Sequence, residues 1–103
     1  MSANELPIAC NLTEPEFQSR RRELLATFRD SLLETRELDH GFAFRFPSDE
    51  SSITRLAQLI AFERRCCPFL QFELRVEAAN GPIWLELSGP AGTKDFLKSL
   101  FAE

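Results

Sequence analysis

Apolar residues recur at helical spacing in the first third of the chain and again at its end. The first run predicts a helix that begins at the capping box Thr13-Glu14-Pro15-Glu16 and continues to about Thr35. The apolar face of this helix holds Phe17, Leu24, Leu25, Phe28 and Leu32. A short C-terminal helix is predicted over residues 93–101, where apolar side chains again share one face. Residues 1–11 are expected to form a short N-terminal arm.

A second long helix is predicted in the middle of the chain. Ser48 is expected to be its N-cap, because a serine oxygen at this position can accept a hydrogen bond from a free backbone N–H of the first turn. Pro68 stops the helix, since the residue before a proline is pushed out of the helical conformation. Cys66 is therefore expected to close the last turn, and Cys67 to leave the helix.

Strict alternation of apolar and polar residues predicts three strands. Residues 42–46 (Phe-Ala-Phe-Arg-Phe) place every Phe on one face. Residues 72–77 and 83–87 alternate in the same way and are joined through Asn80-Gly81, a pair common in hairpin turns. The polar faces of the three strands carry Arg45, Glu73, Arg75, Trp84 and Glu86.

The resulting order α-β-α-β-β-α predicts one α+β domain over residues 1–103. Each strand has one apolar face, so a three-stranded sheet needs helices on one side only, which makes two layers. We expect a split βαβ arrangement, half of a ferredoxin-like fold, with the 83–87 strand antiparallel between the other two. The opposite sheet face would then be open, with Trp84 exposed on it.

Charge and composition exclude several classes of function. The net charge of −4 has the wrong sign for a protein that binds nucleic acid by neutralising phosphates. The chain contains no apolar run of about 18 residues and no signal-peptide pattern, so we expect no membrane contact and a cytoplasmic location. The three cysteines should stay reduced there.

Glu63 interrupts the apolar face of the middle helix, because it follows Ile60 by three residues and precedes Cys67 by four. A buried carboxylate needs a cation or a hydrogen-bond donor. Arg20 and Arg21, which interrupt the apolar face of the first helix, are the candidate partners of Glu63.

Cys66 and Cys67 are adjacent, and Cys10 lies in the N-terminal arm. A disulfide between neighbouring cysteines is disfavoured, because their Cα atoms are about 3.8 Å apart whereas ordinary bridges span about 4.4–6.8 Å. The negative end of the helix dipole also opposes a thiolate, although a soft cation can displace thiol protons itself. If the arm folds back, the three sulfurs could bind Hg(II), As(III) or Cu(I), or Zn(II) with His40 or water as fourth ligand.

Four motifs carry a resemblance to known sequences: P-I-A-C at residues 7–10, F-R-F-P at 44–47, E-R-x-C-C-P-F at 63–69 and G-P-x-G-x-K-x-F-L at 89–97. With these motifs the chain resembles a family of small uncharacterised bacterial proteins. The resemblance implies a shared fold and assigns no catalytic residue.

Three functions stay open at this point. The leading one is binding of a thiophilic metal or metalloid ion through Cys10, Cys66 and Cys67, with Glu63 behind the ligands. The second is a thiol-dependent redox or transfer enzyme with Cys67 as nucleophile and Glu63 as base. The third is an interaction module with buried cysteines that forms a homodimer through the open sheet face near Trp84.

Overall fold

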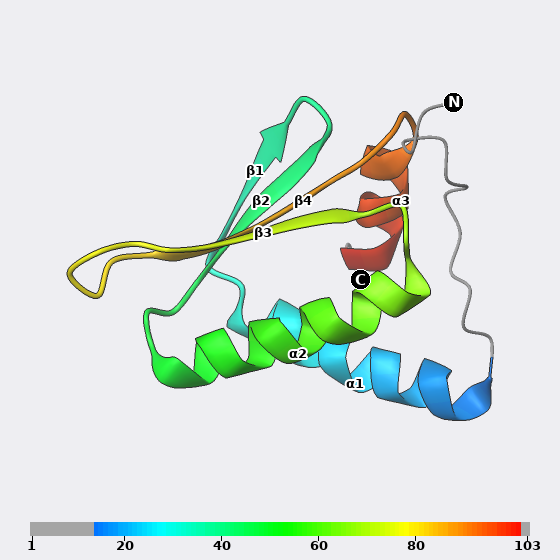
Figure 1. Ribbon diagram of the computed structural model, residues 1–103, viewed down its shortest axis with the longest axis horizontal. Coiled ribbons are helices and arrows are strands. Elements are labelled where there is room, and N and C mark those ends of the chain that lie inside the picture. Colours follow the sequence, from blue (N-terminus) through cyan, green and yellow to red (C-terminus); the bar gives the residue numbers. More distant parts are fainter. Residues whose placement is uncertain (1–13, 102–103) are drawn as a thin grey trace.

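The computed structural model describes residues 14–101 and shows three helices packed on one face of a four-stranded sheet (Figure 1). All neighbouring strands are antiparallel, in the order β1-β2-β4-β3. Along the chain the elements are α1 (Pro15–Ser31), β1 (Glu34–Leu38), β2 (Gly41–Phe46), α2 (Glu50–Cys66), β3 (Gln71–Val76), β4 (Ile83–Ser88) and α3 (Thr93–Phe101).

The prediction of a three-stranded sheet was wrong, because residues 34–38 form a strand where the first helix was expected to end at about Thr35 and no strand was expected. Helix α1 ends at Ser31, and Leu32 already has an extended backbone with φ −66° and ψ 126°. β1 then pairs along its whole length with β2. The other three strands follow the expected order, with β4 between β2 and β3.

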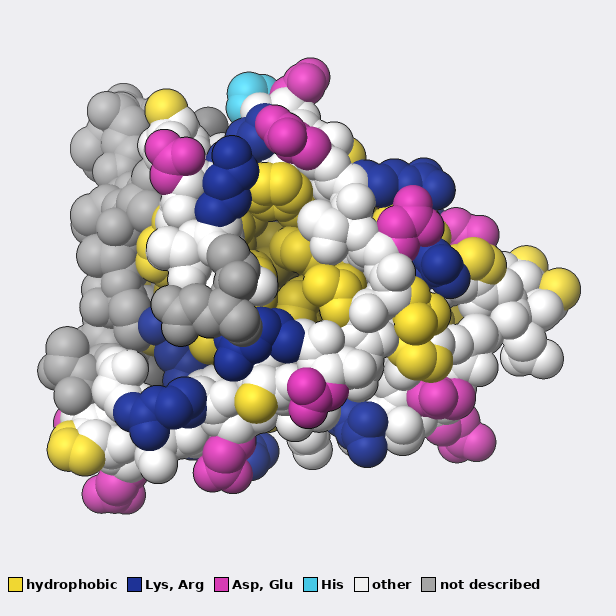
Figure 2. Space-filling view, turned by 180° about the vertical axis from the view of Figure 1, so that it is seen from behind, with side chains coloured by type: hydrophobic (Ala, Val, Ile, Leu, Met, Phe, Trp, Pro, Cys, Tyr) yellow, Lys and Arg dark blue, Asp and Glu magenta, His cyan; other side chains and the backbone are white. Residues whose placement is uncertain are grey.

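The pattern of apolar and polar residues did not predict β1, because this strand adds no apolar face to the sheet. Its five residues are Glu, Thr, Arg, Glu and Leu, and none of them is buried. The strand is held by its backbone pairing with β2 and by ion pairs, in which Glu34 accepts from Arg36 at 2.7 Å and from Arg45 at 3.0 Å. On the helix side, Phe42 and Phe44 of β2 therefore border an apolar hollow of about 160 Å³ beside α3 (Figure 2).

The core lies between the sheet and the helices. Phe28 of α1 packs edge-to-face on Phe44 and Phe46 of β2, with ring centroids 5.1 and 4.9 Å apart. Such aromatic pairs add to the stabilisation from burial itself. β4 contributes its alternate residues to the same core, and these are among the most buried side chains: Ile83, Leu85 and Leu87.

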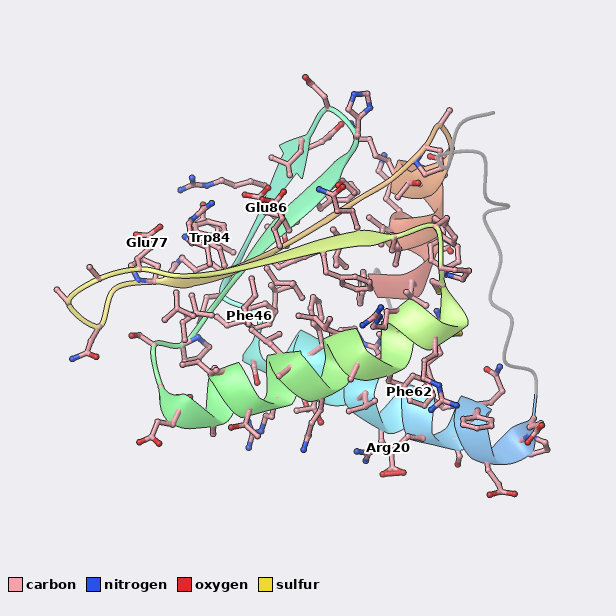
Figure 3. All side chains as sticks on the ribbon, viewed as in Figure 1. Arg20, Phe46, Phe62, Glu77, Trp84 and Glu86 are labelled. Atoms are coloured by element: carbon pink, nitrogen blue, oxygen red, sulfur yellow. The ribbon has the colours of Figure 1, made fainter. Side chains whose placement is uncertain are left out.

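The opposite sheet face is polar, but Trp84 is not exposed on it as expected. Its side chain projects from β4 away from the helices (Figure 3), yet only 5% of the residue is accessible. The guanidinium of Arg36 lies over the indole, 4.6 Å from the ring centroid, in a cation–π contact. Strand β1, absent from the sequence prediction, thus supplies the cover.

Helix α2 begins one residue later than predicted. Asp49, not Ser48, is the N-cap, and its carboxylate accepts from the backbone N–H of Ser52 at 2.7 Å. Cys66 is the last helical residue and Cys67 the C-cap. Among residues 14–101, no helix is long and apolar enough to cross a membrane.

Candidate functional site

A buried ion pair joins the two long helices near the C-terminal end of α2. Glu63 is 2% exposed, and both of its carboxylate oxygens accept from Arg21 of α1. Arg21 Nε lies 3.0 Å from Oε2, and Nη2 lies 3.0 Å from Oε1. This bidentate geometry is the strongest form of Arg–carboxylate contact. It satisfies the buried carboxylate that the sequence placed on an apolar helix face.

Cys67 completes this cluster. Its backbone N–H donates to the carbonyl of Glu63 at 2.6 Å, which turns the side chain toward the carboxylate. Arg21 Nη2 donates to Cys67 Sγ at 3.3 Å, and the thiol in turn lies 3.6 Å from Glu63 Oε1 as a donor. The sulfur is free and fully buried, with 0% of the residue exposed.

These surroundings raise the pKa of the Cys67 thiol to about 12. Burial is the main cause, because it removes water from the thiolate. The negative charge of Glu63 raises the pKa further, and the positive charge of Arg21 offsets part of the increase. At neutral pH the Cys67 thiol is therefore protonated.

Cys66 is also fully buried and is disulfide-bonded, so the expectation that every cysteine stays reduced was wrong. A sulfur atom of a second cysteine is therefore covalently attached next to the free thiol of Cys67. Cys10, the third cysteine of the sequence, lies outside the described residues, as does the Thr13 of the predicted capping box.

The remaining site candidates are not part of this cluster. His40 is exposed in the turn between β1 and β2, where its carbonyl accepts from the N–H of Gly89 at 3.1 Å. Arg20 is exposed on α1 and borders a groove against α2 (Figure 3) instead of facing Glu63. Within residues 14–101, no three His, Cys, Asp or Glu side chains form a group that could hold a metal ion.

Spacing alone could not decide between Arg20 and Arg21, because each precedes a leucine of the predicted apolar face by four residues, Leu24 and Leu25 respectively. The structure decides it: Leu25 is buried, and Arg21 on the same side of α1 contacts Glu63. An aromatic contact that the sequence did not indicate flanks the cluster. Phe17 of α1 and Phe62 of α2 lie with ring centroids 6.1 Å apart, and Arg65 covers the Phe17 ring at 5.4 Å.

The cluster has a defined chemical capacity. Two guanidinium donors and a thiol occupy three of the roughly four lone-pair directions of the Glu63 carboxylate, and the residue is only 2% exposed, so little of it is accessible to an incoming substrate. The sulfur atoms of Cys66 and Cys67 are the remaining candidates for chemistry in this cluster, and both residues are fully buried. The chain was compared with models of protein families, with curated proteins and with solved structures, and none of them matches.

Proposed function

We propose that this protein binds a thiophilic metal or metalloid ion through Cys66, Cys67 and Cys10 when its disulfide is reduced. One observation carries the proposal: Cys66 is bonded to another sulfur while the free thiol of Cys67 follows directly in the chain. The sequence holds three cysteines, so we propose Cys10 as the second sulfur of the bond. Reduction would then leave three thiols at the end of α2.

The surroundings of the sulfurs favour an ion that forms a neutral complex. As(III) with three thiolates and Hg(II) with two carry no net charge, and a neutral complex is the least costly to bury. Zn(II) with three thiolates is anionic and needs a fourth ligand. His40, the ligand suggested for that role, is exposed in the β1–β2 turn and shares no metal-holding group with other described residues. We therefore propose As(III) or Hg(II) as the preferred ions.

The surroundings of Cys67 support a role as a metal ligand better than a role as a nucleophile. A catalytic thiol needs a lowered pKa, and the pKa of Cys67 is raised to about 12. A soft ion does not need a thiolate formed beforehand, because it releases the proton when it binds. Once the proton has left, the N–H of Arg21 that lies 3.3 Å from the sulfur can donate to the thiolate.

The redox step requires an external thiol. A reductant of the glutathione type gives two electrons and two protons to the disulfide, which becomes two thiols while the reductant is oxidised to its own disulfide. The ion then displaces the thiol protons. The cytoplasm supplies such a reductant, and we place the protein there as part of the proposal.

The test is a titration of the fully reduced chain, without excess reductant, with arsenite, Hg(II) and Zn(II) in turn. Formation of metal–sulfur bonds gives a new ultraviolet absorption band, and native mass spectrometry gives the stoichiometry. We expect one As(III) or Hg(II) per chain and weaker binding of Zn(II). No band with any of the three ions would reject the proposal.

Variants assign the ligands. Cys66→Ala and Cys67→Ala should each abolish tight As(III) binding, whereas Cys10→Ala should weaken As(III) more than Hg(II), which needs only two sulfurs. Leu59→Ala is the matched control, because it creates a cavity in the same helix and removes no sulfur. If Leu59→Ala loses the ion as completely as the cysteine variants, the ligand assignment is wrong.

A further inference from the structure

Strand β3 forms one edge of the sheet, and among residues 14–101 its outer side pairs with no other strand (Figure 1). An exposed strand edge is a template for pairing with another chain, and proteins usually block such edges with charge, proline or a bulge. β3 contains no proline, and its register with β4 is continuous from Gln71 to Val76. Its backbone is therefore suited to accept a further strand.

The hairpin that joins β3 to β4 shows which backbone groups face outward. The N–H of Glu77 donates to the carbonyl of Pro82 at 3.2 Å, so Glu77 points its backbone toward the β4 side. In an antiparallel pair the direction alternates along the strand. The N–H and C=O groups of Phe72, Leu74 and Val76 are therefore directed to the free edge.

The side chains of β3 on the open sheet face leave one charge poorly compensated. Glu73 lies directly opposite Glu86 of β4, and like charges in that position destabilise a sheet. Arg75 Nη1 approaches Glu86 at 3.2 Å, but no salt bridge within residues 14–101 involves Glu73. Glu73 lacks the basic neighbour that a paired strand could supply.

A second copy of β3 supplies that neighbour in one register. When two β3 strands run antiparallel with Leu74 opposite Leu74, Glu73 of each copy faces Arg75 of the other. A shift by two residues in either direction places Glu73 opposite Glu73 or Arg75 opposite Arg75, so the charges select the central register. In that register Leu74 faces Leu74 of the other copy, and Phe72 faces Val76. These pairs can exchange backbone hydrogen bonds between the two strands, because their N–H and C=O groups face outward.

Apolar surface borders the same edge on the helix side. Val76 is 51% exposed and Ile53 of α2 is 37% exposed. Between α2 and β3 lies an open depression lined by Ala57, Ile60, Ala61, Arg64, Arg65 and Leu74. Two copies joined at β3 would bring these two α2 surfaces toward each other and cover them.

We infer that the protein forms a two-fold symmetric homodimer by antiparallel pairing of β3 with β3 of a second copy, which makes one eight-stranded sheet. The opposite edge, β1, does not fit this role. Both of its carboxylates already have basic partners, since Glu34 pairs with Arg36 and Arg45 and Glu37 pairs with Lys94, whereas Glu73 of β3 has none among residues 14–101. The inference is independent of ion binding, because it uses none of the cysteines.

The test is sedimentation analysis of the full chain over a range of concentrations, with reductant present so that no intermolecular disulfide contributes. We expect a dimer with a dissociation constant below about 0.1 mM. Glu73→Lys places a lysine opposite Arg75 at both symmetric positions and should weaken the dimer about tenfold or more. The double exchange Glu73→Arg/Arg75→Glu restores opposite charges and should recover most of the affinity.

Two further variants keep the result decisive. Val76→Pro removes an outward N–H and leaves the β4-facing groups intact. This variant should be folded by circular dichroism and monomeric by sedimentation. Glu16→Lys makes the same change of charge as Glu73→Lys on the exposed surface of α1 and should not alter the dimer. A wild-type chain that is monomeric up to about 1 mM would overturn the inference. So would a dimer that Glu73→Lys and Val76→Pro both leave unchanged.

Discussion

The Arg21–Glu63 pair is the contact whose removal should cost the protein most stability. Arg21→Met keeps an unbranched, flexible side chain, although a shorter one, and removes its charge. The Glu63 side chain is 3% exposed, so its carboxylate would be left in the core with the Cys67 thiol as its remaining side-chain partner. Breaking a buried pair by removing one partner costs about 3–5 kcal/mol of unfolding free energy. For a domain of this size each kcal/mol lowers Tm by about 4–8 °C, so we expect a decrease of at least about 12 °C.

The reciprocal substitution should cost less, and the double substitution least. In Glu63→Leu the unpaired Arg21 side chain, which is already 11% exposed on α1, can move its guanidinium toward solvent. Arg21→Met/Glu63→Leu replaces both charges by apolar groups of similar volume, a change that is often neutral or stabilising for buried pairs. We therefore expect the double variant to unfold within about 1 kcal/mol of the wild-type chain.

The assay is urea unfolding in the presence of reductant, followed by the fluorescence of Trp84, the single tryptophan. The four chains form a double-mutant cycle, from which the coupling between the two side chains is obtained. Arg20→Met is the matched control, because Arg20 is exposed on the same helix and should change stability by at most about 0.5 kcal/mol. The reasoning is refuted if Arg21→Met costs less than about 1 kcal/mol, or if the two single effects simply add in the double variant.

Two other predictions follow from the surroundings of Cys67 and Trp84. The unfolded Cys67 thiol loses its proton above about pH 9, whereas the folded thiol keeps it up to about pH 12, so stability should fall as pH rises through this interval. The chain has no tyrosine that would titrate in the same range. The test is urea unfolding at about pH 8 and pH 10, in which the free energy of unfolding should decrease less for Cys67→Ala than for the wild-type chain. Arg36→Ala should uncover the indole of Trp84, shift its fluorescence to longer wavelength and increase quenching by acrylamide, whereas an unchanged spectrum would contradict the cation–π cover.

The elements that the sequence indicated correctly are those whose local pattern and burial agree. α2 and β2 have apolar residues at the period of their own backbone, and one face of each is buried in the core. Glu63 was recognisable as an anomaly for the same reason, since a carboxylate on an apolar face requires a partner. The sequence left Arg20 and Arg21 as equal candidates for that partner, and only the structure shows that Arg21 is the one that contacts Glu63.

β1 could not be found in this way, because its stability comes from pairing and not from its own side chains. Residues 34–38 are mostly charged and lack an apolar face, so the first helix was predicted to continue to about Thr35 and residues 36–38 were assigned to no element. β2 offers them a backbone partner only after the chain has turned back at Asp39 and His40. The burial of Trp84 depends on the same event, because Arg36 covers the ring from β1.

By itself, the sequence indicated an α+β protein, the existence of two long helices and a buried carboxylate beside two cysteines at the end of α2, since each depends on residues close together in the chain. Tertiary structure alone decided the fourth strand, the cover over Trp84, the bond at Cys66 and the strongly raised pKa of Cys67. The fourth strand depends on backbone pairing with β2, and the cover over Trp84 and the pKa of Cys67 depend on side chains brought together from different elements, which no local pattern specifies.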